Sequence, residues 1–266
     1  MQDPTDDDTP FTFLPGNQAG GLLILADHAS NRVPPPYGDL GLPPAQFERH
    51  IAYDIGTGWL VHRLAALTGA PALLTRFSRL LIDPNRGEDD PTLVMRLSDG
   101  AIVPGNARVD AAERQRRIER FHRPYHRAIA DQIDRMSATG VAPVILSIHS
   151  FTPAWKGVPR PWDMAILWDR DDRMVAPALE AFRARGLTVG DNQPYDGALR
   201  NDTLYHHGTA RGLAHLLIEV RQDHIADEAG ASHWAKTIFE VVAPLAARPE
   251  MRETVFCGSR AGGPGM

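Results

Sequence analysis

Three short, uninterrupted apolar runs most constrain what this chain can fold into. They span residues 21–27 (GLLILAD), 141–148 (VAPVILSI) and 213–220 (LAHLLIEV). Runs of this length and composition are typical of strands that are buried on both faces of a parallel sheet. Residues 71–83 and 164–168 predict two further strands. Because segments with helical periodicity separate these runs, the sequence predicts an α/β fold with a mostly parallel central sheet and helices on both faces.

The helices are predicted from apolar residues that recur at helical spacing. Every fourth residue from Phe47 to Trp59 is apolar, which indicates a helix that includes this stretch. A long helix is expected to begin at the N-cap Asp110 and to bend at Pro124. Gly186 is expected to end another helix. The predicted helices span residues 44–68, 110–137, 172–185 and 227–246.

Composition sets limits on the domain organisation and on the class of protein. We find no internal repeat or low-complexity linker, so residues 19–250 are predicted to form a single domain. Residues 1–18 and 257–266 lack apolar periodicity and are expected to be disordered tails. The net charge of −5 disfavours a general nucleic-acid binder, and no apolar run reaches the roughly 18 to 20 residues of a membrane span. One cysteine, Cys257, excludes a disulfide framework. We therefore expect a soluble, cytoplasmic protein, of an oligomeric state that the sequence does not indicate.

Residues suited to metal binding or acid–base chemistry follow or end the three apolar runs. His28 follows the first run, His149 follows the second, and Glu219 lies near the end of the third. In a parallel sheet these ends meet at one edge, where ligands bind. A catalytic zinc ion needs three nitrogen or oxygen ligands and one open position. His28 and His149 are therefore predicted to be two of the ligands.

The third ligand is predicted to be a carboxylate, with Asp54 as the best candidate. Asp54 shares the apolar stripe of the predicted helix over residues 44–68, and a buried carboxylate needs a metal or a charged partner. A salt bridge between Asp54 and an arginine is the alternative interpretation. Asn31, three residues after His28, is the rival ligand, although an amide is a poorer zinc donor than a carboxylate.

Glu219 is predicted to be the general base, because it interrupts an otherwise apolar strand. A carboxylate beside a metal can take a proton from water and pass it to a leaving amine. Arg221 is a candidate for stabilising the oxyanion. The alternative is a surface ion pair between Glu219 and Arg221.

Arginines after the second predicted strand are candidates for binding an acidic substrate. Guanidinium groups bind carboxylates through two parallel hydrogen bonds. Residues 76 and 79 are expected to point to opposite faces of the strand, so not all of the arginines can reach one ligand. For each arginine, a structural ion pair is an equal alternative. The substrate-binding candidates are Arg86, Arg79 and Arg76, in that order, together with Asn85.

His122 and His126 are four residues apart on one predicted helix. The glutamate of an HExxH zinc motif is missing, so the pair does not indicate a zincin. His126 is predicted to border the pocket and to help position the substrate. Residues 206–208 (HHG) are expected to form part of a mobile rim. The sequence contains no GxSxG nucleophile elbow, no phosphate-binding GxxxxGK loop and no GxGxxG after a strand.

Several of these segments together resemble one known family. The segments LADHASNRVP, AYDIGTGW, RFSRLLIDPNR, RPYH, SIHSF and LIEVRQD are similar to motifs of the N-formylglutamate amidohydrolase family, in the same order. The resemblance covers roughly residues 20–246. It implies a three-layer sandwich of the phosphorylase/hydrolase-like fold, similar to zinc-dependent exopeptidases and cell-wall amidases. It also implies a role in histidine degradation.

The resemblance implies the same roles for the site residues. It places zinc, or another divalent metal, on His28, Asp54 and His149, with Glu219 as the base. The related amidases have Glu where this chain has Asp54, which makes the third ligand the least certain. The implied reaction hydrolyses an N-acyl amino acid, with N-formyl-L-glutamate giving formate and glutamate as the namesake substrate.

Two alternative functions remain open at this point. The first is a zinc amidase or carboxypeptidase that acts on another small peptide or acyl-amino acid. The second is a metal-free protein that uses its arginines to bind an acidic metabolite. The set of His28, His149 and Glu219 argues against the second alternative, and the metal content of the purified protein would separate the two.

Overall fold

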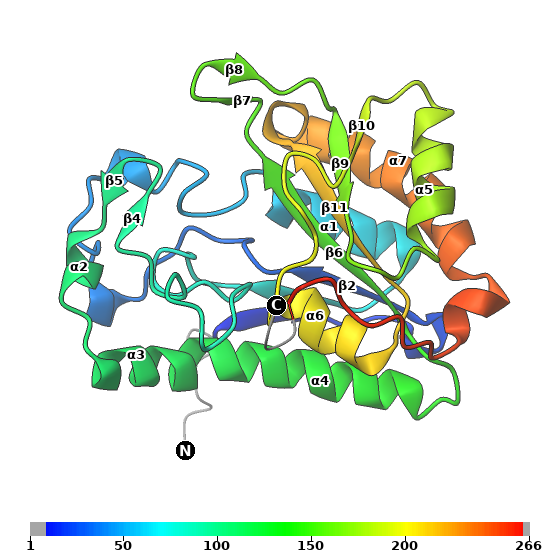
Figure 1. Cartoon of the computed structure of the whole chain (residues 1–266), viewed down its shortest axis with the longest axis horizontal. Helices are drawn as coiled ribbons and strands as arrows, with labels where there is room; N and C mark the ends of the chain where they lie inside the picture. Colours follow the sequence, from blue (N-terminus) through cyan, green and yellow to red (C-terminus); the bar gives the residue numbers. More distant parts are fainter. Residues whose placement is uncertain (1–8, 263–266) are drawn as a thin grey trace.

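The computed structural model describes residues 9–262, which are built around a seven-stranded sheet (Figure 1). The strand order is β1-β3-β2-β6-β11-β9-β10. Strands β3, β2, β6 and β11 are parallel, whereas β1 is antiparallel to β3 and β9 is antiparallel to β11. The predicted mostly parallel α/β sheet is therefore confirmed. The bounds are β1 Phe11–Leu14, β2 Leu22–Ala26, β3 Ala72–Thr75, β6 Val144–Phe151, β9 Met164–Leu167, β10 Val189–Asp191 and β11 His215–Arg221.

Helices pack on both faces of the sheet and complete three layers (Figure 1). One face is covered by α1 (Thr57–Thr68), α5 (Val175–Arg183) and α7 (Glu228–Ala246), which share a buried apolar cluster with the sheet. The other face is covered by α4 (Arg123–Ser137) and α6 (Thr203–His207). This arrangement leaves the carboxyl ends of β2, β6 and β11 free to carry polar groups.

A third apolar cluster lies in the loop-rich part of the molecule, between residues 40 and 121. It packs loops against one another and supports the segments that follow β2 and β3. The short elements of the structure are α2 Pro104–Ala107, α3 Ala111–Arg117, β4 Leu97–Ser98, β5 Ala101–Ile102, β7 Ala154–Trp155 and β8 Val158–Pro159. The 3₁₀ turns are Gln18–Gly20, Pro35–Tyr37, Pro44–Gln46, Thr209–Arg211, Gln222–His224 and Pro249–Arg252.

The long helix predicted over residues 110–137 is confirmed. The side chain of Asp110 accepts a hydrogen bond from the Glu113 amide at 2.8 Å and caps α3. A π-helical turn at Ile118–His122 then joins α3 to α4. This turn lies directly before Pro124, which has no N–H for the regular helical ladder.

The prediction of one helix over residues 44–68 is wrong for its first half. The α-helix begins only at Thr57, after Gly56, which has a φ of +86°. Residues 47–55 form turns, and the Asp54 amide donates a hydrogen bond of 2.9 Å to the His28 carbonyl. The buried Ile51 packs in the third cluster instead of on a helix face. Asp54 therefore lies in the turn before α1 and not on a helix.

The strand predicted over residues 71–83 is also shorter than expected, because β3 ends at Thr75. Beyond it, the Ser78 amide donates to the Arg32 carbonyl at 2.7 Å and the Arg79 amide donates to the Ala52 carbonyl at 3.2 Å. These bonds to the neighbouring loops replace strand pairing. The chain after Thr75 is thereby turned towards the ends of β2 and β6.

Parts of the predicted disordered tails are ordered. Phe11–Leu14 form β1, which pairs with β3, so the prediction is wrong for these residues. At the other end, the Arg260 guanidinium forms an ion pair of 2.9 Å with Asp196. Residues 1–8 and 263–266 of the predicted tails lie outside the described residues. Within residues 9–262, no helix is long and apolar enough to cross a membrane.

Candidate metal centre and pocket

Two histidines and one aspartate meet at the carboxyl edge of the sheet. His28 follows β2, His149 lies in the neighbouring parallel strand β6, and Asp54 is held beside His28 by the backbone bond already described. The Nδ1 atoms of His28 and His149 lie 3.4 Å and 2.9 Å from Asp54 Oδ2. The three side chains are buried, and their ligand atoms lie within 4.8 Å of one another. This cluster could hold a metal ion.

A second carboxylate lies behind each histidine ring. His28 Nε2 is 2.7 Å from Asp83 Oδ1, and His149 Nε2 is 3.3 Å from Asp27 Oδ2. Asp27 also accepts a hydrogen bond of 2.9 Å from the Tyr125 hydroxyl. Carboxylates placed in this way fix the ring orientation and the tautomer of metal-binding histidines.

The donor atoms fit a cation at the centre of the cluster. If each histidine donates its Nε2 proton to the carboxylate behind it, both Nδ1 lone pairs face the Asp54 carboxylate, which is itself an acceptor. Three acceptors facing one another in a buried space need a positive charge between them, either protons or a metal ion. The donor set of two imidazoles and one carboxylate, open on the pocket side, is that of a catalytic divalent metal.

The electrostatics of the cluster lead to the same conclusion. Burial lowers the pKa of His149, but its interactions with the carboxylates of Asp27 and Asp54 outweigh that effect and raise the pKa well above its usual value. Burial and Arg79 lower the pKa of His28, whereas Asp83 and Asp54 raise it, with a net increase. The cluster thus stabilises positive charge at the two rings.

Glu219 lies beside the cluster as its register partner in the sheet. On β11 it pairs with His149 of β6, and in parallel strands the side chains of paired residues point to the same face. Its side chain is buried, and its Oε2 has no hydrogen-bond partner among residues 9–262. Burial, aided by the negative charge of Asp54, raises the pKa of Glu219 to about 7. A carboxyl group with this pKa can both accept and donate a proton near neutral pH.

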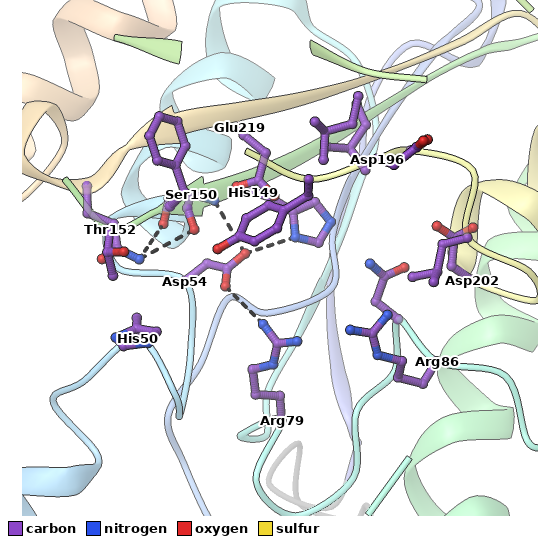
Figure 2. A pocket seen from close by; sticks show the side chains of 18 residues that line it. His50, Asp54, Arg79, Arg86, His149, Ser150, Thr152, Asp196, Asp202 and Glu219 are labelled. Carbon is purple, nitrogen blue, oxygen red and sulfur yellow. Dashed lines mark hydrogen bonds and ion pairs between the residues drawn. The ribbon is translucent and has the colours of Figure 1, made fainter. Parts of the chain in front are cut away.

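A pocket of about 230 Å³ opens onto Asp54, His149 and Glu219 (Figure 2). In Figure 2 these three side chains lie in the middle of the view, whereas Arg86 and Asp202 lie together on one side. The polar lining also includes Arg79 and Asn85, and the apolar lining includes Phe151, Leu167, Leu199 and Leu217. The pocket thus places a cation on one side of the candidate metal centre.

The three candidate arginines have different environments. Arg79 forms ion pairs with Asp83 at 2.7 Å and with Asp54 at 3.5 Å, so its charge is already paired with two carboxylates of the site. Arg86 is half-buried in the pocket lining, and its guanidinium has no hydrogen bond or ion pair within residues 9–262. Arg76 does not line this pocket but a separate hollow beside Phe77 and Phe121. The structure therefore places Arg86 and Arg79 at the site and Arg76 away from it.

Three other predicted residues lie outside the pocket lining. The Arg221 guanidinium pairs with Asp223 at 2.8 Å and donates to the Trp162 carbonyl at 3.0 Å. Its predicted contact with an oxyanion is therefore not supported, because these bonds direct it away from the pocket. His126 is partly buried and lines a separate hollow, and its Nε2 donates a hydrogen bond of 2.9 Å to the Pro84 carbonyl. The rival ligand Asn31 donates to the Phe47 carbonyl at 2.9 Å.

Sequence reasoning missed the supporting carboxylates and several pocket residues, Tyr195 and Asp202 among them. Asp27 directly precedes His28, and Asp83 follows a buried Leu-Leu-Ile run, so a polar residue at the end of each apolar run was the available signal. Tyr195 and Asp202 line the pocket from a loop whose path no periodicity indicates. Burial raises the pKa of Asp202 to about 7.

A comparison with protein families agrees with this geometry. The model of the family described as N-formylglutamate amidohydrolase matches residues 20–226. The chain belongs to the N-formylglutamate amidohydrolase family. The matched range contains the cluster of His28, Asp54 and His149 together with Glu219 and Arg86.

Individual relatives are more distant. An N-formylglutamate deformylase of Pseudomonas aeruginosa is 30% identical over 142 residues, which are 48% of this chain and 51% of the relative. The chain thus spans about half the length of this curated relative. The crystal structure of gene product Atu2144 from Agrobacterium tumefaciens has a TM-score of 0.84 at 31% identity, covering 89% of this chain and 94% of that one.

A second solved structure shows the same fold. An N-formylglutamate amidohydrolase from Ralstonia eutropha JMP134 has a TM-score of 0.63 at 24% identity, over 90% of this chain and 96% of that one. The predicted resemblance to the N-formylglutamate amidohydrolase family is confirmed.

Proposed function

We propose that this chain is a metal-dependent amidohydrolase that cleaves the acyl–amide bond of an N-acyl amino acid, with N-formyl-L-glutamate as substrate and formate and glutamate as products. The proposal rests on the spatial arrangement of metal-binding, acid–base and cationic side chains across one pocket. The buried His28–Asp54–His149 cluster and the unpartnered carboxylate of Glu219 lie together, and the unpaired guanidinium of Arg86 lies to one side. Family membership supports the choice of substrate.

His28, Asp54 and His149 would hold the metal, which we propose is zinc. Asp83 and Asp27 would keep Nε2 of the two rings protonated and leave Nδ1 as the donor atom. Arg79 would hold Asp54 and Asp83 in place through its two ion pairs. When bound, a divalent metal ion supplies Lewis-acid activation of water and of the acyl carbonyl group.

Glu219 would transfer the proton during the reaction. Its unpartnered Oε2 takes a proton from the attacking water, whose oxygen adds to the acyl carbon. The same carboxyl group then gives the proton to the nitrogen as the C–N bond breaks, so that the acid and the free amine leave. The pKa of about 7 suits both steps, because neither protonation state is strongly disfavoured near neutral pH.

Arg86 would bind the side-chain carboxylate of the substrate. It lines the pocket away from the cluster, and its charge acts on the carboxyl groups of Asp83 and Asp202. Its guanidinium forms no hydrogen bond or ion pair among residues 9–262. A bidentate guanidinium–carboxylate pair would fix the far end of the substrate. The apolar wall of Leu167 and Leu217 would lie against its methylene groups.

The test measures metal content and hydrolysis on the same preparation. We expect about one equivalent of metal per chain, release of formate and glutamate from N-formyl-L-glutamate, loss of activity with a chelator and recovery with added Zn²⁺. Parallel additions of Mn²⁺ and Co²⁺ identify the metal that supports turnover. Full activity after complete removal of metal would contradict the proposal. Tight binding of acidic metabolites without metal or turnover would favour the alternative of a binding protein.

A further inference from the structure

Two histidines on one helical segment hold the backbone on both sides of the pocket residue Asn85. His126 Nε2 lies 2.9 Å from the Pro84 carbonyl oxygen, and His122 Nε2 lies 2.9 Å from the Arg86 carbonyl oxygen. A carbonyl oxygen only accepts, so both Nε2 atoms carry the proton. Residues 84–86, which include two pocket-lining residues, are therefore attached to the helical layer by two ring N–H groups.

The protonation of His126 determines which ring nitrogen of a third histidine, His207, carries a proton. His126 Nδ1 lies 2.9 Å from His207 Nε2, and the two rings are stacked with centroids 5.2 Å apart. Burial lowers the pKa of His126 to about 3 and that of His207 to about 4, so both rings are neutral at physiological pH. A neutral His126 that donates through Nε2 accepts at Nδ1, so His207 donates to it. A directed chain thus runs from His207 through His126 to the Pro84 carbonyl.

Helix α6 also holds residues 84–86, through a hydrogen bond to the Asn85 side chain. The Thr203 amide of α6 donates a hydrogen bond of 3.1 Å to Asn85 Oδ1, and His207 belongs to the same helix. On the other side, the Asn85 amide donates to Asp83 Oδ1 at 2.9 Å. The backbone that carries Arg86 is therefore fixed from α4, from α6 and from the metal-supporting carboxylate.

We propose that His126, oriented by His207, is a positioning residue that sets where the Arg86 guanidinium meets the substrate carboxylate. This inference rests on the proposed function, because it assigns Arg86 to that carboxylate. His126 itself does not line the pocket and does not contact the reacting groups. Its effect is expected in the recognition of the charged end of the substrate and not in bond cleavage.

The experiment compares substrates that differ only at the far end. His126→Ala is expected to raise KM for N-formyl-L-glutamate about tenfold, the usual effect of losing one buried hydrogen bond, with kcat within about twofold of the wild type. KM for N-formyl-L-glutamine, which has no side-chain carboxylate, is expected to change less than threefold. His126→Gln keeps an N–H donor and is expected to restore most of the lost affinity. Metal content is expected to stay at the wild-type level in both variants.

A neighbouring histidine provides the matched control. His206 lies next to His207 on α6 and is exposed, and its ring has ring contacts but no hydrogen bond within residues 9–262. His206→Ala is therefore expected to leave both KM values unchanged. His207→Phe keeps the stacked ring but removes the donor, and it is expected to raise KM for the glutamate substrate in the same direction as His126→Ala. This variant also keeps the test available if His126→Ala does not fold.

Binding of the products separates this inference from the proposed function. Calorimetry with L-glutamate and L-glutamine measures recognition of the side-chain carboxylate without turnover. If the wild type prefers glutamate and His126→Ala loses that preference, the positioning role is supported even if N-formylglutamate is not hydrolysed. Equal losses for glutamate and glutamine, wild-type behaviour of His126→Ala, or no preference in the wild type would each overturn it.

Discussion

Glu219 and His149 are register partners on the adjacent parallel strands β11 and β6, and both side chains face the same pocket. The spacing between the candidate base and a candidate metal ligand is therefore set by main-chain hydrogen bonds at the centre of the sheet. Side chains placed by a sheet are more precisely held than side chains on loops. The third ligand, Asp54, comes from a turn and depends on its backbone bond to the His28 carbonyl.

Glu219→Gln is expected to abolish most turnover and to leave the metal bound. Glutamine keeps the shape of the side chain but cannot accept a proton from water, so kcat is expected to fall by about 10² to 10⁴. The wild-type rate is expected to rise with pH as Glu219 loses its proton, with a midpoint at or below its metal-free pKa of about 7, because a bound cation favours the carboxylate. This acidic limb is expected to be missing from the residual activity of the variant. The measurements are pH–rate profiles and metal content. Loss of the metal would instead make Glu219 a ligand.

His28→Ala and His149→Ala are each expected to lose metal and activity together. Each change removes one Nδ1 donor from the cluster and leaves Asp83 or Asp27 without its ring partner. Metal content of the dialysed variants, measured beside that of Glu219→Gln, checks this expectation. A histidine variant that keeps a full equivalent of metal would show that this ring is not a ligand.

Asp54→Asn is expected to weaken metal binding more than Asn31→Ala does. Asp54 contributes a negative charge between two imidazole rings, whereas the Asn31 side chain is occupied by its bond to the Phe47 carbonyl. Metal titration of the two apo variants gives the ranking. The opposite order would move the third ligand to Asn31.

Arg86→Ala is expected to raise KM for N-formyl-L-glutamate by more than tenfold and to affect N-formyl-L-glutamine far less. The variant removes the cation that we assign to the side-chain carboxylate, and a hydrogen bond to a charged group contributes about 1.5–3 kcal/mol. Arg127→Ala, which removes an exposed arginine from α4, is the control for the change in net charge. Equal losses on both substrates would reassign Arg86 to a structural role.

Asp202→Asn is expected to stabilise the protein increasingly as the pH rises. The Asp202 carboxyl has a pKa of about 7 in the folded protein, where burial disfavours its charge, against 3.8 as its ordinary value. The contribution of the Asp202 carboxyl to the free energy of unfolding is therefore fully present below about pH 4 and is lost as the pH rises to about 7. Asparagine can still accept the capping hydrogen bond from the Tyr205 amide.

Melting temperatures between pH 5 and pH 8 measure this effect. The difference between Asp202→Asn and the wild type should widen with pH. Asp227→Asn changes an exposed cap, whose side chain accepts from the Gly230 amide at 2.8 Å, and is the matched control. A constant difference across this pH range would show that Asp202 is ionised in the folded protein.

The strands and the residues on them could be predicted because their pattern is local. A buried strand needs consecutive apolar residues, so His28, His149 and Glu219 stand out where the apolar runs end or are interrupted. Their meeting point follows from the parallel sheet. The family resemblance rests partly on these segments, and the family match confirmed it.

The loops could not be predicted, because long-range contacts determine their paths. The apolar spacing of Phe47, Ile51 and Ile55 is helical, but these residues lie in turns before α1, and Ile51 and Phe47 pack in a loop cluster. The difference between Arg79 and Arg86 has the same origin. Both are arginines near the end of β3, and only the fold shows that Asp83 and Asp54 neutralise one of them.

Asp83 and Arg86 are separated by only two residues, yet one supports a ring of the metal cluster and the other is the free cation of the pocket. In the proposed function, the span between the cleaved bond and the recognised charge would therefore be limited by covalent geometry, at about 3.3–3.6 Å per residue. Because α4 and α6 hold the backbone of residues 84–86, a substrate with one methylene group more or fewer would have to be accommodated by the Arg86 side chain without a shift of that backbone. We therefore expect residues 83–86 to contribute to selection for the length of the substrate. An insertion in this segment would alter that selection without changing a candidate metal ligand.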